Sequence, residues 1–125
     1  MQRAEELAPN RVRFHFERNT GFTKGRVFQC RETFRDMVGG FIVHSRNITV
    51  RDGAFHALGG MGVIHQFSEN LRYERMQLAP RAGYGRTTCG WADMLHFSGC
   101  RGQITVDGVH FSGSHDDPIN VHGTH

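Results

Sequence analysis

A short block of sequence recurs along this chain with a spacing of 23 residues. The block from Asn47 to Asp52 (NITVRD) returns from Asn70 to Arg75 (NLRYER), and the serine two residues before each block is repeated as well. A third copy places Ile104 33 residues after Leu71, which is one period plus an insertion of ten. A fixed period of roughly 20 to 50 residues is typical of solenoids, in which each repeat stacks on the next. The chain is therefore predicted to form stacked coils.

Short runs of apolar and β-branched residues between glycine- and asparagine-containing turns predict the strands of these coils. The predicted strands are 41–44, 48–50, 63–66, 71–73, 94–97, 104–106 and 119–122. Two or three strands per coil favour a parallel β-helix over an antiparallel sandwich or barrel, which short strands also allow. The extra residues of the middle coil fall in a Gly- and Arg-rich segment, 79–88, which predicts a loop on one face, often the binding face of a solenoid.

The first forty residues lie outside the repeat. Residues 1–10 are interpreted as a short helical end or a frayed start, 11–17 alternate as a strand does, 20–25 predict a turn, and 26–31 predict another strand. We expect residues 1–125 to form a single partial β-helix domain, an excerpt of a longer coil, because no capping segment follows the strand at 119–122. Open coil ends also predict self-association.

Composition excludes several classes of protein. The net charge is +3 and the arginines are scattered, whereas a nucleic-acid-binding surface clusters them. No apolar run approaches a membrane span, and no signal peptide precedes the repeats, so the chain is either cytosolic or lacks its natural start. Cys30, Cys89 and Cys100 are odd in number and have no CxxC spacing, which predicts buried thiols rather than a disulfide framework or a zinc site.

Three aspartates are predicted to meet between two coils. Asp93 precedes Asp116 by 23 residues, and one period along the chain is one strand spacing, about 4.8 Å, in space. Asp116 and Asp117 would point to opposite faces of a regular strand, so sharing a site requires a bend near His115-Asp116. Clustered carboxylates raise the pKa of at least one member, which supplies the acid and base needed for sugar chemistry. The structural alternative is that these aspartates cap turns.

The residues around the aspartates suit a sugar. Trp91 offers an apolar face for stacking, although core packing would explain it equally well, and His96 and Asn120 fall on equivalent positions of successive coils. His115 and His122 complete the predicted polar surroundings. No histidine spacing matches a known ligand set, so no metal is predicted, and a polar stack of side chains is the better interpretation.

Four segments carry a resemblance to glycoside hydrolase family 110, the α-1,3-galactosidases. They are GFTKGRVFQCRETFRDMVGGFIVHSRNITVRD, QFSENL, WADMLHFSGCRG and SGSHDDPINVHGTH, and together they cover most of the chain from about Asn19 to His125. The resemblance implies a right-handed parallel β-helix that removes terminal α-1,3-linked galactose with inversion, including the blood-group-B determinant. It implies no metal or organic cofactor, and a secreted or periplasmic full-length parent with further β-rich domains.

The resemblance also implies roles for single residues. Asp116 corresponds to the general acid, and Asp93 and Asp117 correspond to the pair that holds and activates the attacking water. Pro118 stands where a small residue is expected. Two alternatives remain open: a non-catalytic carbohydrate-binding β-helix fragment, and a polysaccharide lyase that uses Ca²⁺ or a basic subsite built from Arg81 and Arg86. The HDD and WAD segments argue against the lyase.

Overall fold

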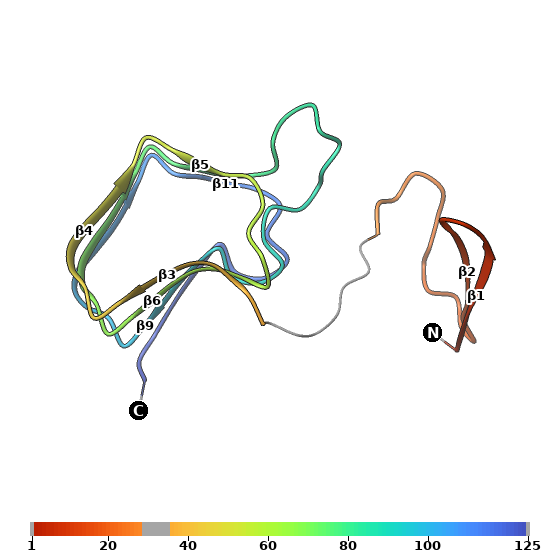
Figure 1. The fold of residues 1–125 in the computed structure, drawn as a ribbon, viewed down its shortest axis with the longest axis horizontal. Coiled ribbons are helices and arrows are strands. Elements are labelled where there is room, and N and C mark those ends of the chain that lie inside the picture. The colour runs from red at the N-terminus through yellow and green to blue at the C-terminus, as the bar shows by residue number, and fades with distance from the viewer. Residues whose placement is uncertain (1, 29–35, 125) are drawn as a thin grey trace. The chain divides into compact units, whose positions relative to one another are not determined.

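The computed structural model describes residues 2–28 and 36–124. It divides the chain into two compact units, Met1–Glu32 and Thr33–His125, which are described separately (Figure 1). The described residues form strands, turns and loops and contain no helix, so none is present there that could cross a membrane. All parallel strands belong to the second unit. The expectation of a single domain over residues 1–125 stays a prediction.

The first unit is built on an antiparallel hairpin. Strand β1 (Arg3–Ala8) pairs with β2 (Arg11–His15), and Asn10 takes the left-handed conformation of the turn with φ 61°. The expectation of a helical or frayed start is therefore wrong, whereas the strand at 11–17 is confirmed over residues 11–15. The Glu5 carboxylate lies 3.4 Å from Arg3 and 3.2 Å from the His15 ring. These cross-strand charges help to fix the pairing.

An aromatic cluster follows the hairpin. Phe22 packs edge-on against Phe16 and Phe28, with ring centroids 5.1 and 4.2 Å apart. Residues 26–28 are not in a strand, because the chain turns through a hydrogen bond from the Arg26 amide to the Thr23 carbonyl. The strand predicted over 26–31 is therefore wrong for its first half, and residues 29–31 lie outside the described residues, as does Cys30.

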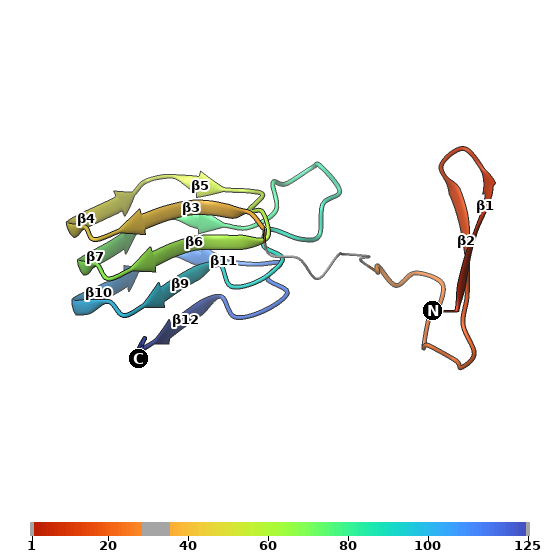
Figure 2. The same cartoon turned by 60° about the horizontal axis from the view of Figure 1, so that its bottom comes forward.

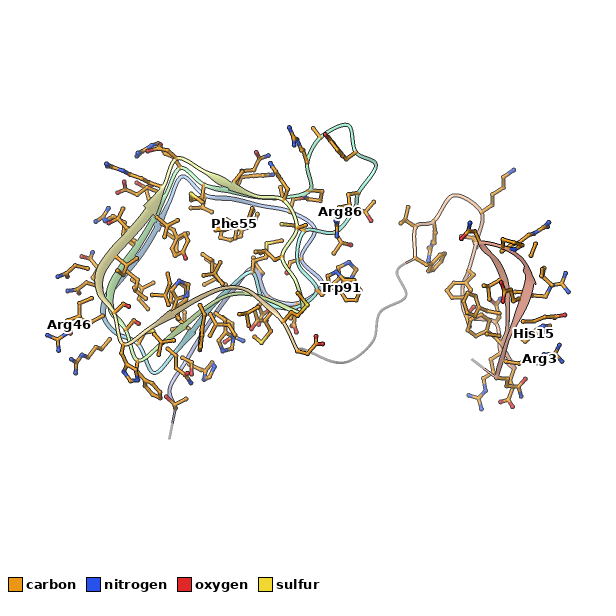
Figure 3. All side chains as sticks on the ribbon, in the orientation of Figure 1. Arg3, His15, Arg46, Phe55, Arg86 and Trp91 are labelled. Carbon is orange, nitrogen blue, oxygen red and sulfur yellow. The ribbon has the colours of Figure 1, made fainter. Side chains whose placement is uncertain are left out.

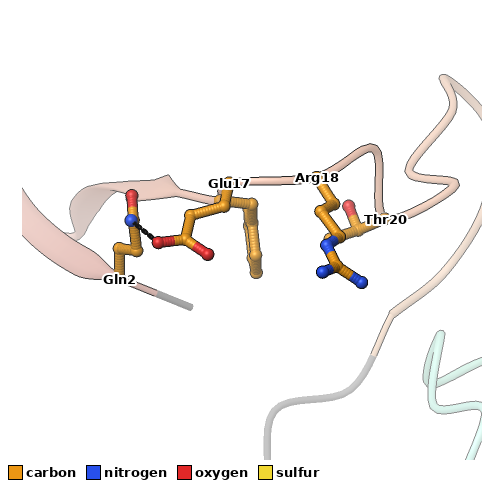
Figure 4. Close-up of a pocket in the computed structure, with 5 residues that line it drawn as sticks. Gln2, Glu17, Arg18 and Thr20 are labelled. Atoms are coloured by element: carbon orange, nitrogen blue, oxygen red, sulfur yellow. Dashed lines mark hydrogen bonds between the residues drawn. The ribbon is translucent and has the colours of Figure 1, made fainter.

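A shallow hollow of about 290 Å³ opens beside this turn (Figure 4). Gln2 donates a hydrogen bond to Glu17 at its edge. Phe16, Arg18 and Thr20 complete the lining. The hollow lies within the first unit, and none of the predicted site residues contributes to it.

The second unit is a parallel β-helix with three faces (Figure 2). Each coil contributes one strand to each face. The first coil holds β3 (Val38–Val43), β4 (Arg46–Arg51) and β5 (Ala54–Phe55). The second holds β6 (Met61–Gln66), β7 (Glu69–Glu74) and β8 (Gln77–Leu78). The third holds β9 (Leu95–Ser98), β10 (Arg101–Asp107) and β11 (His110–Phe111), and β12 (Ile119–His122) begins a fourth. The predicted all-β parallel β-helix is confirmed.

The observed register follows the sequence repeat. Ile48 lies beside Leu71, 23 residues on, and Leu71 lies beside Ile104, a further 33 residues on. At the corner before these strands, the Asn70 amide donates to the Asn47 side-chain oxygen at 3.0 Å. Both asparagines have positive φ, and Gly102 takes the same conformation in the third coil. The recurrence of Asn in the repeat therefore reflects a left-handed corner, which Asn and Gly tolerate well.

The core lies between the three faces and is most complete in the middle coil. Its buried residues are Leu58, Val63, Leu71, Tyr73, Met76, Leu78, Cys89, Met94, Leu95 and Phe97. Cys89 is fully buried and Cys100 is partly buried, which agrees with the expectation of packed thiols. The segment 79–88 forms the predicted loop, which projects from the coil between β8 and β9 (Figure 1).

Candidate active site

The three predicted aspartates come together on the coil. One carboxylate oxygen from each of Asp93, Asp116 and Asp117 lies within 4.8 Å of the other two. Asp93 is 3% exposed, whereas Asp116 and Asp117 are exposed. Among the described residues, this is the one place where three His, Cys, Asp or Glu side chains meet at such a distance. The expectation that one repeat period brings them together is confirmed.

The register pairs these aspartates differently from the sequence period. Gly90 bridges to Ser114, and Leu95 pairs with Ile119, so this part of the coil has an offset of 24 residues rather than 23. Asp93 therefore lies opposite Asp117, and the Met94 amide donates to the Asp117 carbonyl at 3.0 Å. Asp116 reaches the cluster from the preceding bend.

A bend places Asp116, as the sequence predicted. His115 and Asp116 form the bend immediately before β12. The Ser114 hydroxyl donates to the Asp116 carbonyl at 2.7 Å, and its oxygen lies 3.4 Å from the Asp116 amide. Such local serine contacts stabilise turns. The bend explains how two adjacent aspartates can both face one site.

The backbone of Asp93 packs against a glycine of the preceding coil. The Gly62 amide donates to the Asp93 carbonyl at 2.9 Å. A Cβ atom on Gly62 would lie 2.5 Å from the Asp93 oxygen and 2.1 Å from the Met94 oxygen. Glycine is therefore required at this position for the segment carrying Asp93 to approach so closely.

A chain of hydrogen bonds leads from Asp93 to the surface. The Asp93 Oδ2 atom lies 2.7 Å from His96 Nδ1, and His96 Nε2 lies 2.9 Å from His122 Nε2. The chain ends at the Gly123 carbonyl, 2.9 Å from His122 Nδ1. His96 is half-buried and His122 is exposed. Both histidines lie on the outer side of the sheet formed by β3, β6, β9 and β12.

Counting hydrogens along this chain gives its charge. The Gly123 carbonyl only accepts, so His122 Nδ1 carries a hydrogen, and each of the other two links needs one hydrogen as well. Three hydrogens on two imidazoles and one carboxyl group are one more than two neutral imidazoles and an ionised carboxylate hold. The complete chain is therefore electrically neutral, with the additional proton on Asp93, His96 or His122. It is an arrangement that can store a proton beside the carboxylate cluster.

The structure places the remaining predicted site residues around this chain. Asn120 pairs with His96 in the strand register, as the sequence indicated. The His115 Nε2 atom lies 2.8 Å from the hydroxyl of Thr88. Trp91 is half-buried and projects outward at the corner of the coil, on the same side as Arg86 in Figure 3. An outward indole at the site's margin is better suited to contact with a ligand than to core packing.

The projecting loop uses its arginines within itself. Arg81 lies over the Tyr84 ring with its guanidinium carbon 5.1 Å from the ring centroid. Arg86 donates through Nε to the Thr88 carbonyl at 3.2 Å. Both contacts stabilise the loop, and they involve the two arginines that the lyase alternative would need as a basic subsite.

Sequence reasoning missed three residues that support the site. Thr88 is buried and holds His115, Gly62 admits the Asp93 backbone, and His65 lies beneath His96 in the core. The Gly-Gly pair before β6 marked only a corner. A histidine on an otherwise apolar inward row was the available signal for His65.

The aspartate cluster provides few donors for a cation. It offers three carboxylate groups, whereas Ca²⁺ takes about six to eight oxygen ligands. One of the oxygens, Asp93 Oδ2, is already engaged with His96. The donor set is better suited to moving protons than to enclosing Ca²⁺.

Comparison with known proteins identifies relatives of this segment. No protein-family model matches the chain. It is 44% identical over 123 residues to alpha-1,3-galactosidase A of Bacteroides thetaiotaomicron, which covers 98% of this chain and 22% of that protein. It is 43% identical over 121 residues to alpha-1,3-galactosidase A of Akkermansia muciniphila, covering 96% of this chain and 20% of the relative.

A second type of relative is more distant. Alpha-1,3-galactosidase B of Bacteroides thetaiotaomicron is 33% identical over 100 residues, which cover 80% of this chain and 16% of that protein. The chain thus spans about a fifth of the length of the curated relatives that it matches. Nearly all of the chain takes part in the matches to the A-type proteins.

Proposed function

We propose, because this chain belongs to the α-1,3-galactosidase family, that the protein hydrolyses terminal α-1,3-linked galactose. The observation that carries the proposal is the meeting of Asp93, Asp116 and Asp117 on the coil. Glycoside hydrolysis needs one carboxyl group to protonate the leaving oxygen and another to activate water or attack the sugar. The cluster supplies both, and the relatives' names supply the sugar and the linkage.

We assign Asp116 as the general acid and Asp93 with Asp117 as the groups that activate water. In this reaction the Asp116 carboxyl proton passes to the glycosidic oxygen as its bond to the galactose C1 breaks. A water molecule attacks C1 from the opposite face and passes its proton to the Asp93–Asp117 pair. Inversion of configuration at C1 follows from this geometry. The exposure of Asp116 and Asp117 supports direct contact with a glycan.

The hydrogen-bonded chain supports the role of Asp93. When the additional proton lies on His96 or His122, Asp93 is ionised and can accept a proton from water. His96 occupies Oδ2 at 2.7 Å, which fixes the orientation of the carboxylate. The role of His96 is that of an orienting partner, as is common for groups that hold a catalytic base.

Inversion sets a requirement on spacing. Acid and base in inverting enzymes stand about 6.5–9.5 Å apart, whereas retaining enzymes hold their two carboxyl groups about 5–5.5 Å apart. The nearest oxygens of the three aspartates lie within 4.8 Å. The inverting assignment therefore requires the bound sugar and water to separate Asp116 from the pair, which makes the configuration of the product a decisive test.

The direct test is release of galactose from Galα1-3Gal by this chain and by a version extended past His125 with the remaining coils of a relative. Asp116→Asn keeps the size of the side chain but cannot donate the acid proton, so it should lower kcat by about 10²–10⁴-fold. Asp107→Asn is the matched control, since Asp107 is an exposed carboxylate at the end of β10, outside the cluster.

The outcomes separate the candidate functions. Turnover that is lost in Asp116→Asn and kept in Asp107→Asn supports the proposal, whether the short or only the extended chain is active. Galactose binding without turnover in either version would contradict it and favour a carbohydrate-binding module. Ca²⁺-dependent cleavage of a uronate polymer would favour a lyase instead.

A further inference from the structure

A buried histidine lies directly beneath the candidate site. His65 on β6 is fully buried and stacks on the Phe97 ring, with centroids 4.3 Å apart and an interplanar angle of 19°. Its Nδ1 atom lies 3.1 Å from the His96 carbonyl oxygen, and its Nε2 atom lies 2.8 Å from the Tyr73 hydroxyl. Tyr73 on β7 is itself 1% exposed.

The partners of His65 fix its protonation. The His96 carbonyl can only accept, so the hydrogen of the neutral ring is on Nδ1, and Nε2 accepts from the Tyr73 hydroxyl. Burial lowers the pKa of His65 to about 4 and raises the pKa of Tyr73, so both groups stay neutral near pH 7. His65 is thus held as a single tautomer by hydrogen bonds at both nitrogens.

The position of His65 in the coil shows that it is not needed to fill space. The inward row that contains it has Ile42 in the preceding coil and Phe97 and Val121 in the following ones. An apolar side chain would fill the same space, whereas burying an imidazole costs roughly 1–3 kcal/mol unless its hydrogen bonds are made. Its two hydrogen bonds are therefore what distinguish His65 from its neighbours.

The carbonyl that His65 holds belongs to the residue that orients Asp93. His96 receives the His65 hydrogen bond on its backbone inside the coil and contacts Asp93 with its ring outside the coil. We propose that His65 is a positioning residue, which fixes the His96 backbone from inside the core and thereby sets the His96 imidazole against Asp93. Its consequence for catalysis rests on the proposed function, but its structural part does not.

The test uses two substitutions in the extended chain. His65→Leu fills the space but makes neither hydrogen bond, whereas His65→Asn places an amide donor near the position of Nδ1. Galactose release is measured together with the imidazole signals of His96 by NMR. Leu71→Ala is the matched control, because Leu71 is a buried residue of β7 with no printed contact to His96 or Asp93, and it lowers stability without removing this hydrogen bond.

We expect His65→Leu to lower kcat at least about tenfold with KM nearly unchanged, as loss of a transition-state alignment does. The His96 signals should shift, His65→Asn should restore most of both, and Leu71→Ala should change neither in the folded protein. Wild-type kcat and unshifted His96 signals in His65→Leu would overturn the proposal.

A second variant covers failure of His65→Leu to fold. Tyr73→Phe leaves the Nδ1 hydrogen bond intact and should shift the His96 signals less than about half as far as any folded His65 variant without a donor. If the wild-type protein releases no galactose, the proposed function fails, while the His96 signals still decide the positioning role. Unchanged His96 signals in every folded variant would then overturn it.

Discussion

Asp93 and Asp117 face each other across one strand spacing in different surroundings. Asp93 is buried and bonded to His96, whereas Asp117 is exposed and precedes Pro118. Proline keeps Asp117 extended at the start of β12. The two carboxylates therefore differ in freedom and in contact with water, and the buried one is the better candidate for a fixed orientation.

Substitution of Asp93 tests this difference. Asp93→Asn keeps the size and one oxygen for His96, but it removes the group that receives a proton from water. We expect kcat on Galα1-3Gal to fall by about 10²–10⁴-fold. An unfolding experiment on the same protein distinguishes this loss from a loss of structure, and full activity in a folded Asp93→Asn protein would remove Asp93 from the mechanism.

The buried imidazole of His65 makes stability depend on pH in a definite direction. Its pKa is about 4 in the folded chain and 6.5 for the model value, so the unfolded chain binds a proton first as the pH falls. The contribution is complete above about pH 6.5 and is lost between there and about pH 4, at a cost of about 3 kcal/mol.

The free energy of unfolding in urea, compared between wild type and His65→Leu, isolates this term. The difference between the two proteins should change by up to about 3 kcal/mol between about pH 7 and about pH 4. Parallel pH profiles for the two proteins would show that His65 is protonated equally in both states.

At the scale of the elements, close approach between coils decides where the site residues stand. β6 and β9 are neighbours in the four-stranded sheet, and the missing side chain of Gly62 admits the Asp93-Met94 backbone. The glycine acts through space rather than through an unusual φ, since it is not among the residues with positive φ. A single methyl group there would displace the buried aspartate.

Gly62→Ala is therefore expected to destabilise the coil by roughly 1–3 kcal/mol, as overpacking does, and to lower galactosidase activity in the folded protein. Gly59→Ala is the matched control, because its Cβ would lie 3.4 Å from the nearest atom, Met37 Cβ, an ordinary contact. Thermal unfolding and galactose release are measured on both variants. Equal behaviour of the two would contradict the role assigned to Gly62.

Periodicity predicted the strands that carry apolar runs and missed the shortest ones. β5, β8 and β11 have two residues each, too few to show any pattern. The hairpin strand β1 was missed because its sequence RAEELA suits a helix, and pairing with β2 overrides that propensity. The meeting of the aspartates followed from the repeat, but their register did not, since the offset changes from 23 to 24 within one coil.

The supporting contacts could not be predicted from the sequence. Which face His65 occupies, and that its ring reaches the His96 carbonyl, depends on the register of β6 against β9. The resemblance carried by the WAD and HDD segments did identify the family, and the relatives agree with it. Those segments surround the three aspartates themselves, which is why they were informative.

At the scale of the molecule, the described coils are open at the last strand. Val121 on β12 is 62% exposed although it belongs to the inward row, and Ile119 on the same row is 39% exposed. The site lies between β9 and this strand, so whatever packs on β12 also borders the site. The chain spans about a fifth of its relatives, which is why activity is best tested with the short and the extended chain side by side.

The measurement that tests the central claim most directly is proton NMR of the galactose released from Galα1-3Gal in the first minutes of the reaction. The account predicts that the β anomer appears first and that the α anomer grows in later by mutarotation, because water attacks C1 opposite the leaving group. Release of the α anomer first would contradict the roles assigned to Asp93, Asp116 and Asp117, and an absence of galactose would contradict the proposed activity itself.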